Sequence, residues 1–128
     1  MKLTDLFRSL VIANLLLLVL QAVFAGRMID GDGHSLYLHG LTAGVVVLMG
    51  VFQATTAVLL WRKGIAPRSF AFANAGFLVG EILTYGAGER HILVLHIPLA
   101  LLLVGGLVHQ SFWVQRLAEH PAQWETAK

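Results

Sequence analysis

The chain has 128 residues, of which 57% are hydrophobic and 12% are charged, and its formal net charge is +2. A composition this apolar is typical of a polytopic membrane protein and argues against an ordinary soluble domain. The sequence contains no cysteine, which excludes disulfides and thiolate metal ligands. The few basic residues lie near the ends of apolar segments and give no indication of a nucleic-acid partner.

Four apolar segments are each long enough to cross a bilayer, which takes about 20 helical residues. A membrane-spanning segment must satisfy its backbone hydrogen bonds internally, and the sequence lacks the alternating pattern of a barrel strand, so we expect helices. The predicted fold is all-α. It is one integral-membrane four-helix bundle over residues 1–128, with helices at about 6–26, 36–61, 69–87 and 92–115 and a cytoplasmic tail at 116–128.

The second half of the chain resembles the first. The segment 34–43 recurs 57 residues later as the segment 91–100, so that His39 matches His96 and a histidine opens each copy. Leucine matches are common in so apolar a chain, but two histidines in register are not. We therefore predict that the two halves are equivalent.

The helix before each copy also recurs, at an offset of 60 residues, where Gln21 matches Glu81. Together the two matches predict that the bundle is built from two tandem helical hairpins. The change of offset from 60 to 57 predicts that the loop near 27–35 is three residues longer than the loop near 87–91.

Basic residues are distributed unevenly between the two sides of the predicted bundle. Only Arg27 and Arg90 fall on one side. The other side holds Lys2, Arg8, Arg62, Lys63, Arg68, Arg116 and Lys128. The positive-inside bias then predicts a multi-pass protein of the cell inner (plasma) membrane with both termini in the cytoplasm and the lipid bilayer as its first partner.

The two matched histidines lie at the same predicted depth, a few residues inside the outer end of their helices. At about 100° per residue, each shares a stripe with small side chains and a glutamine, which is the composition of a buried seam. We also expect Gly40 and Gly44 to let the helices approach closely. The stripes are His39, Ala43, Val46, Gly50, Gln53 and Ala57 in the second helix, and His96, Ala100, Leu103, Leu107, Gln110 and Val114 in the fourth.

Two neutral imidazoles that face each other across a bundle can supply both axial ligands of a haem iron. The sequence therefore predicts a haem b with His39 and His96 as its metal ligands. Ala43 and Ala100 lie one turn farther in, where small side chains would leave room for the macrocycle.

Other interpretations of the histidines remain open. Each could hydrogen-bond across helices in a protein without a cofactor. A zinc or copper ion needs three or four ligands, which would require His34 and His91 as well. Five residues separate each of these from the inner histidine, so we expect this outer pair to cap the surface or contact a haem propionate. His109 has no repeat counterpart and is predicted to point away from the seam.

Glu81 is the one acidic residue within an apolar segment. It could relay protons or contact a quinone, with Tyr85 predicted on the same helix face. A hydrogen-bonded structural carboxyl group is the alternative.

The order of these features resembles one four-helix half of the haem A synthase family. In that family the second and fourth helices of each half carry a histidine near the outer surface, and this chain has His39 and His96 there. The resemblance covers nearly the whole chain and implies a haem b held by these two residues.

The function predicted from the sequence is that of a cytochrome b-like electron carrier, or a small subunit of a larger redox complex or homo-oligomer. One alternative is a cofactor-free accessory or assembly subunit of a membrane complex, and another is a haem-modifying enzyme. Electron transfer or an accessory role is favoured over enzymatic activity, because a bis-histidine iron has no open coordination position.

Overall fold

The computed structural model describes residues 2–119, which form four α-helices. They are α1 (Leu3–Ile29), α2 (Gly33–Arg62), α3 (Arg68–Glu89) and α4 (Leu93–Glu119). The all-α prediction is confirmed, and α1 to α3 extend beyond their predicted bounds at both ends. Each helix is long and apolar enough to cross a membrane. Most of the predicted tail, including His120 and Lys128, lies outside the described residues.

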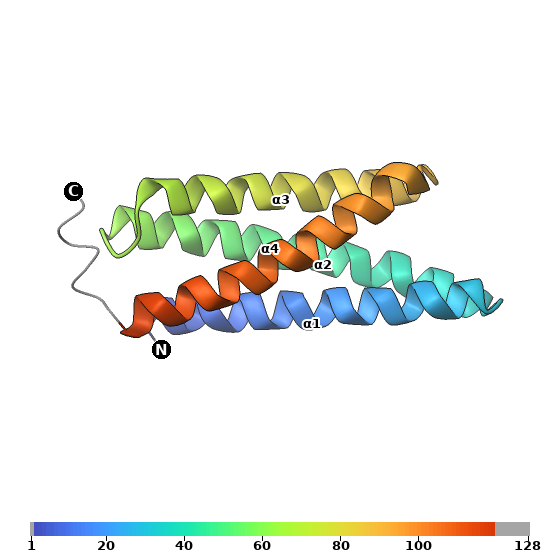
Figure 1. Ribbon diagram of the computed structural model, residues 1–128, viewed down its shortest axis with the longest axis horizontal. Coiled ribbons are helices and arrows are strands. Elements are labelled where there is room, and N and C mark those ends of the chain that lie inside the picture. Colours follow the sequence, from blue (N-terminus) through green and yellow to red (C-terminus); the bar gives the residue numbers. More distant parts are fainter. Residues whose placement is uncertain (1, 120–128) are drawn as a thin grey trace.

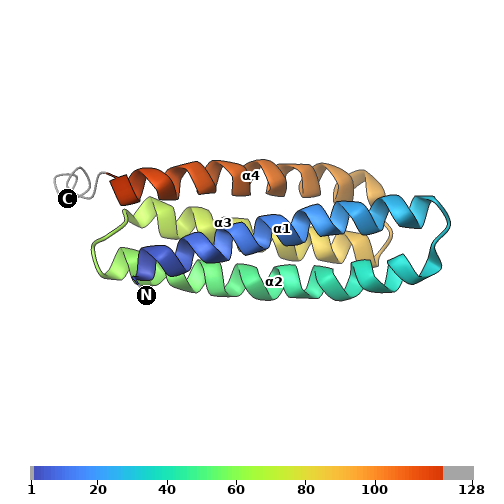
Figure 2. The ribbon, with the colours of Figure 1, turned by 90° about the horizontal axis from the view of Figure 1, so that it is seen from below.

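The helices form an antiparallel bundle in which each packs against two others. Around the bundle the order is α1, α2, α3, α4, and α4 closes the ring against α1 (Figures 1 and 2). Helices α2 and α4 therefore lie diagonally opposite each other. The α1–α2 and α3–α4 connections share one end, called here the loop end (Figure 1). The start of α1 and the α2–α3 connection share the other, called the terminal end.

The buried side chains of α1 repeat every seven residues. They are Phe7, Val11, Asn14, Leu18 and Gln21. A spacing of alternately four and three residues is that of helices packed side by side at a shallow angle. The same spacing recurs at Val46, Gly50, Gln53, Ala57 and Leu60 in α2, and at Leu103, Leu107 and Val114 in α4. The predicted inward stripes are buried at these positions, whereas five other members are half-buried: His39, Ala43, His96, Ala100 and Gln110.

The outer face of the bundle is apolar, and its apolar core also contains several polar side chains. Large aliphatic side chains such as Leu16, Leu101 and Leu102 are more than 60% exposed. The interior, by contrast, contains buried polar side chains: Asn14, Gln21, Gln53, Asn74 and Glu81. Water would not stabilise this arrangement, whereas a lipid environment solvates the outer face and leaves the polar groups to bond one another.

The predicted difference in loop length is wrong. Both connections contain three residues, 30–32 and 90–92. Their backbones also match at an offset of 60, because Gly31 (φ 90°) and His91 (φ 57°) both adopt the left-handed conformation. The N–H of Gly31 donates to the Met28 carbonyl, and that of His91 donates to the Gly88 carbonyl.

A stagger of the two hairpins replaces the expected loop difference. His39 lies eight residues after Gly31, whereas His96 lies only five after His91. The two histidines can be level only if the first hairpin projects about one helical turn farther, since a turn takes 3.6 residues. The α1–α2 connection does extend beyond the α3–α4 connection in both ribbon views (Figures 1 and 2).

Candidate functional site

The rings of His39 and His96 face each other across the bundle near the loop end. Their centroids are 6.1 Å apart and their planes make an angle of 64°. The two residues come from the diagonal helices α2 and α4, and both are half-buried. The pairing predicted from the sequence is confirmed as a spatial one.

A backbone carbonyl orients each ring. Nδ1 of His39 lies 3.2 Å from the carbonyl oxygen of Gln21, and Nδ1 of His96 lies 2.8 Å from that of Thr84. A carbonyl oxygen can only accept, so in these hydrogen bonds Nδ1 carries the proton and donates it. The lone pair of each neutral imidazole is then on Nε2, the nitrogen left for a ligand or metal.

The ring spacing leaves room for one metal ion between the two Nε2 atoms. If one iron lay between the two Nε2 atoms, metal–nitrogen bonds of about 2 Å, plus about 1 Å from each ring nitrogen to its centroid, would separate the ring centroids by about 6 Å. The observed 6.1 Å agrees with that value. Two Nε2 lone pairs from diagonal helices are also the ligands that bundle cytochromes use. Ala43 and Ala100 follow the two histidines by about one turn and are half-buried, and their small side chains would leave room for a flat group.

The lack of a side chain at Gly88 makes room for the His96 ring. A Cβ added at Gly88 would lie 2.9 Å from Nδ1 of His96, closer than real side chains pack. The predicted close approach at Gly40 and Gly44 is wrong, because an added Cβ would have no neighbour within 4 Å at either position. A second close contact of this kind is at Gly50, where an added Cβ would overlap the Glu81 carboxyl group. The sequence did not indicate which of these glycines lie at close helix contacts, since all of them are in helices.

Gln21 supports the other histidine and was not predicted as a site residue. Its Nε2 donates to the carbonyl of His39 at 2.9 Å and to the hydroxyl of Thr42 at 2.7 Å. The backbone carbonyl of Gln21 accepts a hydrogen bond from His39 Nδ1. Gln21 therefore holds α2 against α1 at the level of the rings. Its position on the polar face of α1 was the available signal.

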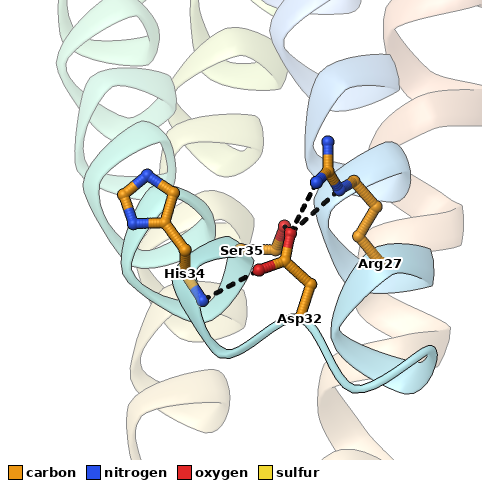
Figure 3. A network of polar contacts seen from close by, with 4 residues as sticks. All are labelled: Arg27, Asp32, His34 and Ser35. Atoms are coloured by element: carbon orange, nitrogen blue, oxygen red, sulfur yellow. Dashed lines mark hydrogen bonds and ion pairs between the residues drawn. The ribbon is translucent and has the colours of Figure 1, made fainter.

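The outer histidines do not join the pair. His34 is the second residue of α2; its backbone N–H donates to Asp32 at 3.1 Å, and its exposed ring points away from Asp32 (Figure 3). The centroid of that ring lies 6.2 Å from the centroid of the Tyr37 ring. His91 is exposed in the α3–α4 connection. Among the described residues, no group of three or more His, Asp or Glu side chains is placed to hold a metal ion. The four-histidine zinc or copper site is thus not assembled by residues 2–119.

A polar cluster closes the loop end of the first hairpin (Figure 3). Asp32 accepts from the Ser35 hydroxyl at 2.8 Å and forms an ion pair with Arg27 at 2.7 Å. The Ser35 hydrogen bond, followed by the His34 N–H and Arg27, holds the pKa of Asp32 below its usual value. The second hairpin has Ile92 at the equivalent position, so only the projecting hairpin is closed in this way.

Two further polar levels lie between the histidines and the terminal end. Asn14 donates to Glu81 at 2.7 Å, and both side chains are buried. Farther on, Gln53 donates to Asn74 at 3.1 Å and to Gln110 at 2.5 Å. These contacts cross the bundle and fix the relative depth of all four helices.

Two predicted positions are placed away from the histidines. His109 is exposed on α4 and points out of the seam, as predicted. Tyr85 does not share the buried face of Glu81, because its side chain is 38% exposed and its neighbour Thr84 is buried instead. The prediction assumed 3.6 residues per turn, whereas the packed face of α3 follows the seven-residue spacing of Asn74, Glu81 and Gly88.

Comparison of this chain with known protein families, with curated proteins and with solved structures found no match.

Proposed function

We propose that the protein is a multi-pass membrane cytochrome that holds one haem b between His39 and His96 and passes electrons. The observation that carries this proposal is the facing pair of rings, 6.1 Å apart, each with Nδ1 bonded to a backbone carbonyl. Haem would supply one-electron redox chemistry there. The protein's contribution is to fix the ring orientation and exclude water.

The bundle is proposed to lie with its terminal end in the cytoplasm. The described basic residues at that end are Lys2, Arg8, Arg62, Lys63, Arg68 and Arg116, and only Arg27 and Arg90 lie at the loop end. The haem would then be near the outer face of the plasma membrane. The two hairpins are proposed to be tandem repeats, supported by the matching backbones of their connections.

An electron-transfer role is favoured over catalysis on the haem. If His39 and His96 both bound the iron, no coordination position would remain for oxygen or substrate. Membership of a larger redox complex or homo-oligomer is consistent with the extensive exposed apolar surface, which lipid also explains.

The optical spectrum tests this function. Protein purified in detergent from haem-sufficient cells should show a Soret band, with sharp α and β bands that appear on reduction by dithionite. The cofactor-free alternative predicts a helical protein of the same size without visible absorption, and that result would end the cytochrome proposal.

A further inference from the structure

A carboxyl group lies in the middle of the bundle with one of its oxygens unpaired. Glu81 is 1% exposed, and Asn14 Nδ2 donates to its Oε1 at 2.7 Å. Its Oε2 is buried without a hydrogen-bond partner. A Cβ added at Gly50 would overlap this oxygen, so glycine is what makes the space for the carboxyl group.

Among the described residues, no ion pair involves Glu81. The sequence has no Asp, Glu, Lys or Arg between Arg8 and Arg27 in α1, between the start of α2 and Arg62, or between Arg68 and Glu81 in α3. Its neighbours Asn14 on α1 and Gly50 on α2 are uncharged. An isolated carboxylate in an apolar interior is far more costly than a neutral carboxylic acid. Burial therefore favours the form that carries a proton.

The other titratable groups lie above and below this level. His39 and His96 lie toward the loop end. On α1, Asn14 marks the level of Glu81 and Gln21 marks the level of His39, and these seven residues span about 10 Å along the helix. His109 lies toward the terminal end on α4, and Tyr85 is on the exposed face of α3. None of them contacts the carboxyl group in the way Asn14 does.

Polar side chains continue from Glu81 to a groove at the terminal end. Gln53 is one turn from Gly50 on α2, and its amide nitrogen donates to Asn74 and Gln110. Both acceptors line a groove of about 300 Å³ between α3 and α4, together with Ser69 and His109. The buried Oε1 of Gln53 and Oδ1 of Asn14 also lack a donor. Water entering from the groove would provide the donors that buried oxygens need.

We propose that Glu81 is a proton-binding site that exchanges its proton with the terminal-end surface through Gln53, Asn74 and Gln110. The acid releases the proton to water in this path and becomes a carboxylate, which the Asn14 amide N–H stabilises. Return of the proton restores the acid. The site belongs to the apoprotein and does not depend on the haem proposal.

Infrared spectroscopy of the full-length protein in lipid tests the proton site. At neutral pH the wild type should show the carbonyl stretch of a protonated carboxylic acid, and the band should shift when water is replaced by D₂O. Glu81→Gln should remove the band, whereas the matched control Glu89→Gln, at the exposed end of α3, should retain it. Absence of the band in the wild type, or its survival in Glu81→Gln, would overturn the site.

The environment of the carboxyl group provides a second variant, should Glu81→Gln fail to fold. Asn14→Leu removes the hydrogen bond to Oε1 and should move the band to higher frequency, as for a free acid. An unmoved band would mean that the acid observed is not Glu81.

The path is tested by the rate of deuterium exchange at this band. Gln53→Leu should slow the exchange at least tenfold, and Gln110→Leu serves the same purpose if the first variant is unstable. Thr55→Val, on the exposed face of α2, is the control and should exchange at the wild-type rate. Equal rates in all variants would contradict the path. Visible absorption of the same samples reports haem separately, so failure of one proposal is distinguishable from failure of the other.

Discussion

Gln53 donates a hydrogen bond to Gln110 across the bundle, fourteen residues from His39 on α2 and from His96 on α4. The two diagonal helices, α2 and α4, therefore contact each other at two depths in the bundle, through the histidines and through the glutamines, and the two contacts are equally spaced along both helices. Fourteen residues are two seven-residue repeats, so both pairs face the same seam. Substitution of either glutamine should lower the free energy of unfolding, and should also shift the relative positions of His39 and His96 because the same two helices carry both pairs.

Replacement of Gln53 by Leu should lower the free energy of unfolding by about 1–3 kcal/mol, because two acceptors, Asn74 Oδ1 and Gln110 Oε1, lose their donor. Gln110→Leu should cost less, since Gln53 keeps its bond to Asn74. Thermal unfolding in detergent measures both. The exposed Thr55→Val change is the control and should leave the melting temperature unchanged. Equal losses for the two glutamine variants would show that the hydrogen bonds are not shared as described.

The sequence predicted which side chains of α2 and α4 face the interior better than it predicted the packing around them. The inward stripes and the pairing of His39 with His96 followed from residue spacing, because a helix fixes which side chains share a face. The assignment of Tyr85 failed because packed helices repeat every 3.5 residues, and the small drift moved the buried position to Thr84.

Other details depended on backbone geometry that spacing does not encode. Identical three-residue connections forced the length difference into a stagger of the hairpins. The partners of the two rings are main-chain carbonyls, which every residue has, so residue spacing could not identify Gln21 and Thr84 as ring partners, although the polar face of α1 marked Gln21 as an interior residue. For the same reason, Gly50 and Gly88 could not be distinguished from Gly40 and Gly44.

His91 should be replaceable by glycine with a gain in stability. Its φ of 57° is in the left-handed region, which costs a residue with a side chain roughly 1–2 kcal/mol relative to glycine, partly offset by the greater freedom of glycine in the unfolded chain. We expect a higher melting temperature for His91→Gly and an unchanged haem spectrum. Gly31→Ala, at φ 90° in the equivalent turn, is the opposite control and should lower the melting temperature. A loss of haem in His91→Gly would instead make His91 a ligand.

Acidification should loosen the α1–α2 connection. The pKa of Asp32 is lower in the folded protein than its ordinary value of 3.8, chiefly through the Ser35 hydroxyl. Its contribution to stability is therefore complete above that ordinary value and is lost as the pH falls through the lower, folded pKa. Asp32→Asn should reduce the drop in melting temperature on acidification, measured from neutral pH to about pH 3. Asp30→Asn, outside the cluster, should follow the wild type. If the melting temperature of Asp32→Asn fell on acidification as much as that of the wild type, the acid sensitivity would come from other carboxyl groups.

The ligation of the haem tests the central claim most directly. Electron paramagnetic resonance and optical spectra of the oxidised protein should show low-spin, six-coordinate iron. His39→Ala and His96→Ala should each abolish that signal or convert it to five-coordinate high-spin iron, because each removes one axial nitrogen. His109→Ala, on the exposed face of the same helix as His96, should leave the spectrum intact. Retention of the low-spin signal in His39→Ala or His96→Ala, or its loss in His109→Ala alone, would contradict the assignment of the facing pair as the haem ligands.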